Sequence, residues 1–290
     1  MIRVLGTGLT GLVGTRIREV LPEIDFTFLS RSQGVDLTDF NAVEEYIASY
    51  SGTHILHMAA LTDVDGCESE KDLGEKSEAW IINVEVTREI ARLCLKYRKI
   101  LIYISTDFVF DGEKKEGEGY GEEDTPNPIN WYGKTKFEGE KAVTGVGVLS
   151  AILRIAYPYG ISSAPKKDFV RIIAERLKSN QPVKAVTDHI FVPTYIDDIA
   201  YAIKKVIEEN ATGIVHVVGD QPLTPFLAAQ KIAKAVGKDP SKIEPTTREE
   251  YFASKALRPL NLYLKNDRIK SLNVSMRTFE QGLSEMKNNL

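Results

Sequence analysis

The chain has 290 residues, enough for one large domain or two smaller ones, and its 43% hydrophobic and 27% charged residues are ordinary for a globular protein. The formal net charge of −4 argues against a nucleic-acid-binding protein, and no apolar run approaches the roughly 20 residues that cross a bilayer. No signal peptide is expected and two cysteines are too few for a disulfide framework, so we expect a reduced, cytoplasmic protein without nucleic-acid or membrane partners.

Short β-rich segments alternate with helical patterns through the first half of the chain, which is typical of a parallel sheet with crossover helices. We expect strands at residues 2–5, 26–29, 54–59, 100–105 and 149–155, and helices at residues 11–21, 41–50, 77–97 and 130–143. The last three strands are mostly apolar rather than alternating, as expected where helices cover both faces of a sheet. The predicted fold class is therefore α/β, with a Rossmann-type doubly wound parallel sheet.

The pattern changes after Ile155, because four prolines divide the chain into shorter pieces. Helices are expected at residues 169–177, 196–207 and 225–236, and a strand at 214–218. We infer a dinucleotide-binding domain of residues 1–155, to which about 190–212 returns. Residues 156–189 and 213–290 would then form a smaller C-terminal α/β substrate-binding lobe. The charged, glycine-rich segment 111–124 is interpreted as a solvated loop rather than a substrate lid.

A glycine-rich loop follows the first expected strand and opens the first expected helix. Its glycines have the spacing GxxGxxG, which permits a tight turn and lets backbone amides approach a pyrophosphate. The free N–H groups and the dipole of the helix N-terminus would stabilise the phosphates. We therefore predict a dinucleotide site whose loop residues are Gly8, Leu9, Thr10, Gly11, Leu12, Val13 and Gly14.

The acidic residue that usually binds the ribose after the second strand is absent, and Ser30 and Arg31 stand in its place. An arginine there suits a 2′-phosphate, which favours NADPH over NADH and leaves NAD as the alternative cofactor. Asp36 and Leu37 would approach the adenine edge. Ala59 and Ala60 end the third strand, where small side chains would let the nicotinamide side of the cofactor lie close to the backbone.

Three side chains after the fourth strand offer the parts needed to protonate a carbonyl oxygen while hydride arrives at its carbon. Thr106 ends that strand, where its hydroxyl can hydrogen-bond a developing alkoxide. Tyr132 and Lys136 lie four residues apart, and so on one helix face. We expect Lys136 to lower the pKa of the Tyr132 phenol, which would act as general acid, and to bind the nicotinamide ribose.

The YxxxK spacing is not specific by itself, because it occurs three times in the chain. Only Tyr132 and Lys136 follow a strand that ends in Ser-Thr. The other two pairs, Tyr201 with Lys205 and Tyr251 with Lys255, are interpreted as coincidences on solvated helix faces. No histidine spacing suggests a metal site.

These residues together resemble the extended short-chain dehydrogenase/reductase superfamily and, within it, the dTDP-4-dehydrorhamnose reductase family. The resemblance covers nearly the whole chain, and its matching segments are residues 8–14, 59–65 with Glu68, 105–112, 132–136 with 139–140, 153–160, 193–194 and 258–261. It implies that NAD(P)H reduces the C4 ketone of dTDP-4-dehydro-L-rhamnose to give dTDP-L-rhamnose. It also implies a nucleotide-sugar substrate and a homodimer.

The resemblance implies site residues as well. Thr106, Tyr132 and Lys136 fall on the family's catalytic positions, and Asn83 matches a position tied to active-site architecture. The substrate-binding residues that it implies are Thr62, Val64, Thr106, Asp107, Phe108, Tyr157 and Arg258. Phe108 and Tyr157 stand where the family often has Tyr and Trp, and His57-Met58 replaces a more usual Asn-Ala. These departures leave the identity of the sugar open.

Alternative functions remain at this point. Sugar-nucleotide 4,6-dehydratases carry Asp-Glu after the threonine, whereas here Asp107 is followed by Phe108, which argues against dehydration. A sugar-nucleotide epimerase that cycles hydride through bound NAD stays open. So does a non-catalytic NADP-binding regulatory subunit, because the chain also resembles the β subunit of methionine adenosyltransferase.

Overall fold

A computed structural model describes residues 2–290, apart from the side chain of Ser32. Its centre is a six-stranded parallel sheet in the order β2-β1-β3-β4-β5-β9. The bounds of these strands are β1 Ile2–Thr7, β2 Ile24–Phe28, β3 His54–His57, β4 Ile100–Thr106, β5 Ser150–Ile155 and β9 Gly213–Val217. The chain runs from β1 to β2 on one side and returns to β3 on the other, so the strand order reverses at β1. In open α/β sheets ligands bind at the carboxyl ends of the strands beside such a reversal.

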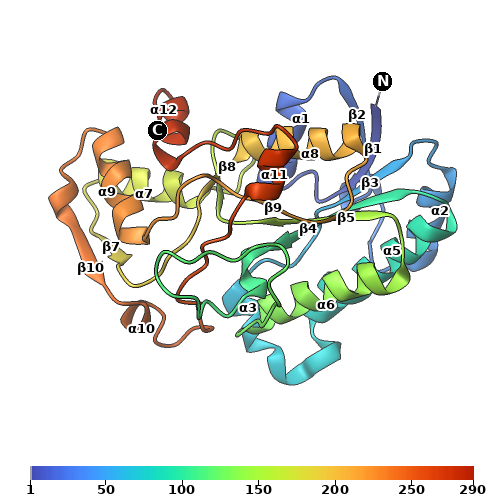
Figure 1. Ribbon diagram of the computed structural model, residues 1–290, viewed down its shortest axis with the longest axis horizontal. Coiled ribbons are helices and arrows are strands. Elements are labelled where there is room, and N and C mark those ends of the chain that lie inside the picture. Colours follow the sequence, from blue (N-terminus) through green and yellow to red (C-terminus); the bar gives the residue numbers. More distant parts are fainter. Residues whose placement is uncertain (1) are drawn as a thin grey trace.

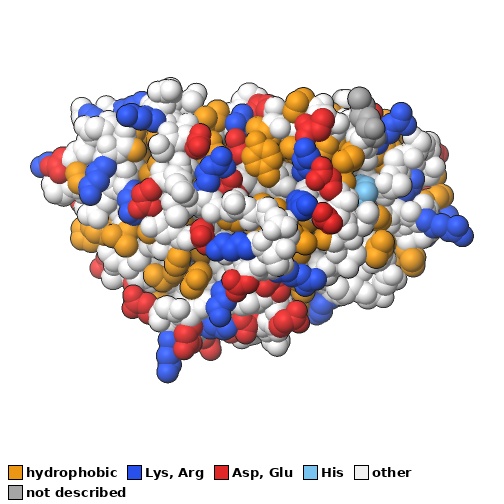
Figure 2. Space-filling view, turned by 45° about the horizontal axis from the view of Figure 1, so that its top comes forward, with side chains coloured by type: hydrophobic (Ala, Val, Ile, Leu, Met, Phe, Trp, Pro, Cys, Tyr) orange, Lys and Arg blue, Asp and Glu red, His pale blue; other side chains and the backbone are white. Residues whose placement is uncertain are grey.

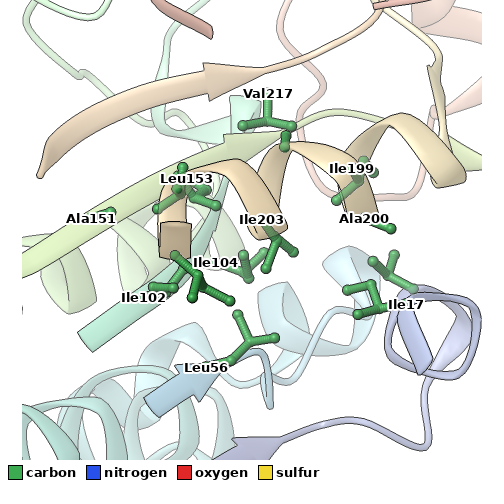
Figure 3. Packing of buried hydrophobic residues seen from close by; sticks show 14 of the residues in the cluster. Ile17, Leu56, Ile102, Ile104, Ala151, Leu153, Ile199, Ala200, Ile203 and Val217 are labelled. Carbon is green, nitrogen blue, oxygen red and sulfur yellow. The ribbon is translucent and has the colours of Figure 1, made fainter. Parts of the chain in front are cut away.

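Helices cover both faces of the sheet (Figure 1). One face packs against α1 (Leu12–Val20) and α8 (Ile196–Glu209), and the other against α2 (Phe40–Ser49), α5 (Val86–Lys96) and α6 (Trp131–Val146). On the first face Ile199, Ala200 and Ile203 of α8 lie over Leu56 and Ile102 of the sheet (Figure 3). The strands carry apolar side chains on both sides, which confirms the predicted doubly wound fold.

The helical stretch expected at 77–97 is not one regular α-helix. It contains α4 (Glu78–Trp80), a π-helical turn at Ile81–Glu85, and then α5. The side chain of Asn83 projects from this turn to the backbone of Leu61, which fixes the chain after β3. π-Helical turns are often found at functional sites, and no periodicity of apolar residues marks them in advance.

The rest of the chain forms a smaller lobe around its own hydrophobic cluster. Its helices, drawn at the left and top of Figure 1, are α7 (Phe169–Lys178), α9 (Pro225–Ala235) and α12 (Phe279–Met286). A parallel pair, β7 (Val183–Val186) with β10 (Ile243–Thr246), packs against α9. The remaining short elements of this half are β6 (Pro158–Tyr159), β8 (Thr194–Tyr195), α10 (Arg248–Tyr251) and α11 (Asp267–Ser271).

The boundary expected near residue 212 needs a correction. β9 was assigned to the second lobe, but it pairs with β5 as the sixth strand of the central sheet. Helix α11 then packs on β9, and its Ile269 joins the core of the first lobe. The chain therefore returns to the first lobe twice, because the exposed edge of β5 is covered only when β9 pairs with it.

The segment 111–124 is held down rather than free. The Asn261 Nδ2 atom lies 3.0–3.1 Å from the carbonyl oxygens of Lys114, Lys115 and Glu118. Tyr120 is buried, stacks on Phe110 and donates its hydroxyl proton to Asp111 (2.6 Å). Residues 115–118 at its centre are exposed, as expected of a solvated loop, but one late asparagine satisfies three backbone carbonyls and so anchors the loop.

The surface carries charges of both signs. Lys and Arg side chains are interspersed with Asp and Glu on the face drawn in Figure 2. Across residues 2–290, no helix combines the length and the apolarity needed to traverse a bilayer. Both cysteines, Cys67 and Cys94, are buried free thiols.

Candidate active site

The glycine-rich loop lies between β1 and α1 at the carboxyl edge of the sheet. Gly8 has φ 69°, and a Cβ atom there would approach the backbone N of Ala59 to 2.7 Å. A Cβ atom on Gly14 would lie 2.5 Å from the Leu9 Cα atom. Gly11 begins α1 without a side-chain cap, so the first N–H groups of the helix face outward for an anion. The close approach of backbone at these glycines and the uncapped helix start form a cradle that fits a dinucleotide pyrophosphate.

Within that loop the side chains differ in what they can offer. Leu9 and Val13 are buried in the core of the first lobe, so only their backbone faces a ligand. Thr10 and Gly11 are exposed, and Leu12 is half-buried. The loop therefore presents backbone amides and the Thr10 hydroxyl to a ligand.

Arg31 lies just beyond β2, beside the glycine loop. Because β1 and β2 are parallel neighbours, Ser30 and Arg31 share the sheet edge at which Gly8 lies. The Arg31 guanidinium is three-quarters exposed and pairs with the Asp36 carboxylate at 3.0 Å. Asp36 also accepts hydrogen bonds from Thr38, which lower the pKa of its carboxyl. Leu37 packs on the core at the same place.

Residues at the end of β3 form the other side of the cradle. The Thr7 hydroxyl accepts hydrogen bonds from the backbone N–H groups of Met58 (3.1 Å) and Ala59 (3.0 Å). Ala59 and Ala60 are half-buried, so a flat ligand can lie against their backbone. Behind them the buried His57 ring bonds the Thr7 hydroxyl through Nδ1 at 2.7 Å.

Thr106, Tyr132 and Lys136 meet where β4 ends and α6 begins. Asn130 caps α6 by accepting the N–H of Gly133 at 2.8 Å, which fixes where Tyr132 enters the helix. The side chains of Thr106 and Tyr132 lie close enough to interact with each other. All three residues are more than nine-tenths buried. The structure therefore brings the predicted hydroxyl, phenol and amine into one water-poor site.

Lys136 is held by the strand beneath it. Its Nζ atom donates to the Ile104 carbonyl at 2.8 Å and lies 4.2 Å from the centre of the Tyr103 ring. Burial lowers the pKa of Lys136 to about 7, and the nearby Glu140 carboxylate opposes this effect. The sequence did not indicate the contact between Tyr103 and Lys136, because Tyr103 has the pattern of an ordinary apolar strand residue.

The expected effect of Lys136 on Tyr132 is absent from the structure. Burial raises the pKa of the Tyr132 phenol above its ordinary value, and only the neighbouring Thr106 side chain opposes the rise. Desolvation disfavours the charged form of each group, so the amine and the phenol are shifted in opposite directions. The prediction of a lowered phenol pKa is wrong here. Tyr132 instead stays protonated, as a proton donor must.

Asp107 follows Thr106 and is also buried. Its Oδ1 atom accepts from the Thr106 hydroxyl at 3.0 Å, while Oδ2 has no hydrogen-bond partner among the described residues. Burial raises the pKa of this carboxyl to about 7. A buried unpaired carboxylate oxygen is unfavourable by itself, so a ligand that supplies a donor would stabilise it.

The residues predicted to bind substrate surround this site from several segments. Val64, Phe108 and Tyr157 pack in one cluster with Tyr132, and the Phe108 ring meets the Tyr132 ring edge-on at 5.7 Å. Arg258 reaches the same region from the C-terminal part of the chain, where it pairs with Asp65 at 2.8 Å.

Thr62 lies on the exposed rim and accepts from Lys166 at 3.4 Å, so Lys166 is a rim cation that the sequence did not indicate. Asn83 links two of the matched segments. It bonds the Leu61 backbone in both directions and donates to the Thr135 hydroxyl at 3.0 Å. It therefore ties the chain after β3 to the catalytic helix. Among residues 2–290, no group of three or more His, Cys, Asp and Glu side chains is placed to hold a metal ion.

Comparison with known proteins agrees with this geometry. The family model described as the RmlD substrate binding domain matches residues 2–290. The crystal structure of a dTDP-4-dehydrorhamnose reductase from Bacillus anthracis in complex with NADP superposes with a TM-score of 0.89, at 31% identity over 100% of both chains.

Two curated proteins are similar in sequence. Methionine adenosyltransferase 2 subunit beta from Bos taurus is 32% identical over 98% of this chain and 86% of its own. A probable low-salt glycan biosynthesis reductase from Haloferax volcanii is 29% identical over 97% of this chain and 96% of its own.

Proposed function

The chain belongs to the RmlD substrate binding domain family of extended short-chain dehydrogenase/reductases, and on that premise we propose that it reduces the C4 ketone of a nucleotide-activated deoxysugar, dTDP-4-dehydro-L-rhamnose, to give dTDP-L-rhamnose. The observation that carries this proposal is the buried group of Thr106, Tyr132 and Lys136 beside the glycine-rich cradle. NADPH is the proposed hydride donor, with NADH as the alternative, because Arg31 occupies the ribose-binding position.

Each of the three buried residues has its own role in the proposed reaction. Bound NADPH supplies the hydride to C4 of the sugar. As negative charge develops on the C4 oxygen, the Thr106 hydroxyl turns its proton from Asp107 to that oxygen and Tyr132 transfers its phenolic proton to it. Lys136 binds the nicotinamide ribose. Burial of the three groups excludes water and strengthens each interaction.

The two lobes have separate tasks in this proposal. The sheet domain binds the dinucleotide through the glycine-rich cradle and Ser30, Arg31, Asp36, Leu37, Ala59 and Ala60. The smaller lobe and the rim bind the nucleotide sugar through Thr62, Val64, Asp107, Phe108, Tyr157 and Arg258. We expect a cytoplasmic enzyme and a homodimer, as in the family that the chain resembles.

A second candidate is a non-catalytic NADP-binding subunit. It is favoured by the likeness to methionine adenosyltransferase 2 subunit beta over 98% of the chain. Such a subunit would bind the cofactor and reduce nothing at a useful rate. Turnover therefore separates the two candidates.

The test supplies the purified protein with enzymatically generated dTDP-4-dehydro-L-rhamnose and follows the oxidation of NADPH and, separately, of NADH. We expect rapid oxidation with formation of dTDP-L-rhamnose. Tyr132→Phe is the matched control, and it should lower kcat by roughly 10²–10⁴-fold while NADPH binding persists. Binding of NADPH by the wild-type protein without oxidation would overturn the reductase and favour the regulatory subunit.

A further inference from the structure

Tyr157 has an unusual backbone conformation beside the proposed active site. It lies between β5 and β6 with φ 39°, in the left-handed region that residues other than glycine rarely adopt. Such a conformation is unfavourable by itself and persists only where the surroundings hold it. Here the Tyr157 carbonyl accepts the N–H of Thr194 at 3.2 Å, and its ring packs on Phe191 with centroids 4.6 Å apart.

The Tyr157 hydroxyl has a fixed partner. It lies 3.1 Å from Nε2 of His189, whose Nδ1 is 2.7 Å from the Pro259 carbonyl oxygen. A carbonyl oxygen only accepts, so Nδ1 carries the ring proton. Burial lowers the pKa of His189 to about 4, so the ring is neutral near pH 7 and Nε2 is an acceptor. The phenol of Tyr157 must then donate its proton to His189.

The direction of this hydrogen bond determines how else the Tyr157 hydroxyl can bond. With its proton directed at His189, the phenolic oxygen is left with lone pairs and acts as an acceptor toward any other group. The ring lies 6.2 Å from that of Phe108, which in turn contacts Tyr132. The unpartnered Asp107 Oδ2 lies in the same neighbourhood, since Asp107 and Tyr157 interact electrostatically. The Tyr157 oxygen can accept a further hydrogen bond, and hydroxyl groups of a sugar are donors.

We propose that Tyr157 is a specificity-determining acceptor for a hydroxyl of the ketosugar, and that His189 is the positioning residue that directs the phenolic oxygen toward it. The chemical class thus selected is a sugar that keeps a hydroxyl near its C4 carbonyl, in preference to the deoxygenated analogue. This inference rests on the proposed reductase function and deepens it, because it concerns the substrate of that same site.

The first test compares kcat/KM for the sugar in the wild-type protein, Tyr157→Phe, His189→Phe and the double variant. Loss of one neutral hydrogen bond should lower kcat/KM about 5–10-fold, mainly through KM. His189→Phe keeps a ring to stack on Phe191 and should cause a similar loss. If His189 acts through the Tyr157 hydroxyl, the double variant should lose no more than either single variant.

The control is His54→Gln. His54 is also buried, but it lies at the start of β3 and bonds Asn210, at the opposite end of the sheet from the site. Its replacement should leave kcat/KM unchanged. NADPH binding by each variant reports whether the fold is intact. Additive losses in the double variant would overturn the positioning role of His189.

The second test uses analogues of dTDP-4-dehydro-L-rhamnose that lack the 2-hydroxyl or the 3-hydroxyl. The wild-type protein should disfavour one of them by about 5–10-fold, whereas Tyr157→Phe should accept it as well as the parent sugar. Equal discrimination by both proteins would overturn the inference. Calorimetric binding of dTDP-L-rhamnose to the same variants gives the comparison without turnover, so a failure of the reductase function and a failure of this inference give different results.

Discussion

The Nζ atom of Lys136 lies 4.2 Å from the centre of the Tyr103 ring, deep between β4 and α6. The same ring stacks on His57, with centroids 5.6 Å apart. A desolvated ammonium over an aromatic face is stabilised by about 2 kcal/mol. Tyr103 therefore favours the charged form of Lys136, whereas burial favours the neutral form.

We predict that Tyr103→Leu moves the pH dependence of the enzyme. The pKa of Lys136 is about 7, so kcat/KM for NADPH should fall as pH rises through that value and the amine loses its charge. Removal of the ring destabilises the ammonium, lowers the pKa of Lys136 and shifts this fall to lower pH by about 1.5 units. Tyr103→Phe keeps the ring and should leave the profile in place. Identical profiles for the Leu variant and the wild type would contradict the prediction.

Arg31 should determine the choice between NADPH and NADH. Its guanidinium is mostly exposed and needs only to leave Asp36 to reach a 2′-phosphate. We predict that Arg31→Ala raises KM for NADPH by about 10–100-fold, the effect of losing a hydrogen bond to a charged group. KM for NADH, which has no 2′-phosphate, should not change and so serves as the internal control. Arg31→Lys should lose less. A parallel rise for both cofactors would assign Arg31 to the shared part of the dinucleotide.

Much of the sheet domain could be predicted, because its signals are local. Apolar strands and amphipathic helices alternate with the correct spacing, and the glycine triplet fixes the first turn. The strand at 214–218 was recognised as well, but its pairing with β5 was not. Pairing between distant segments depends on which sheet edge remains exposed, and no local pattern records that.

The candidate site likewise contains residues that the sequence identified and residues that it did not. Thr106, Tyr132 and Lys136 were found because a strand end and a helix start mark them. The partners that orient site residues were not found, because Tyr103 reads as a core residue and His189 lies in an irregular segment. The lowered phenol pKa was wrongly expected because helical spacing gives the distance between two groups but not their burial, and here burial dominates.

The buried ion pair of Arg154 and Glu140 should be a sensitive point for stability. Arg154 Nη2 lies 2.7 Å from Glu140 Oε2, both side chains are less than 5% exposed, and Ser105 donates to the same carboxylate. We predict that Arg154→Met lowers the free energy of unfolding by about 3–5 kcal/mol, because it leaves a buried carboxylate without its cation. The double variant Arg154→Met/Glu140→Gln should recover part of this loss.

Urea unfolding measures these changes. Arg92→Met breaks the half-exposed pair with Glu89 on α5 and should cost less than about 1 kcal/mol, so it controls for loss of an arginine. The double variant is compared with Arg154→Met and Glu140→Gln. If its free energy of unfolding fell by the sum of the two single losses, the two charges would not interact.

His57 should make the fold sensitive to acid. The ring is buried between the hydroxyls of Thr7 and Thr87, and burial lowers its pKa to about 3, with the charge of Lys136 adding to the effect. Between the ordinary histidine pKa of about 6.5 and this value, the unfolded chain binds a proton that the folded protein does not. The free energy of unfolding must therefore fall as pH is lowered through that range.

We predict that His57→Asn, which keeps a hydrogen-bonding side chain but cannot titrate, removes part of this acid sensitivity. Relative to the wild type, the variant should gain of the order of a few kcal/mol between about pH 7 and about pH 4, measured by urea unfolding at each pH. Thr87→Val removes a partner of the ring without removing the titration, so its loss of stability should be nearly the same at both pH values. His189 and His216 are also buried with lowered pKa values, so the variant should keep some acid sensitivity. An equal stability difference between wild type and His57→Asn at the two pH values would mean that His57 is already protonated in the folded protein.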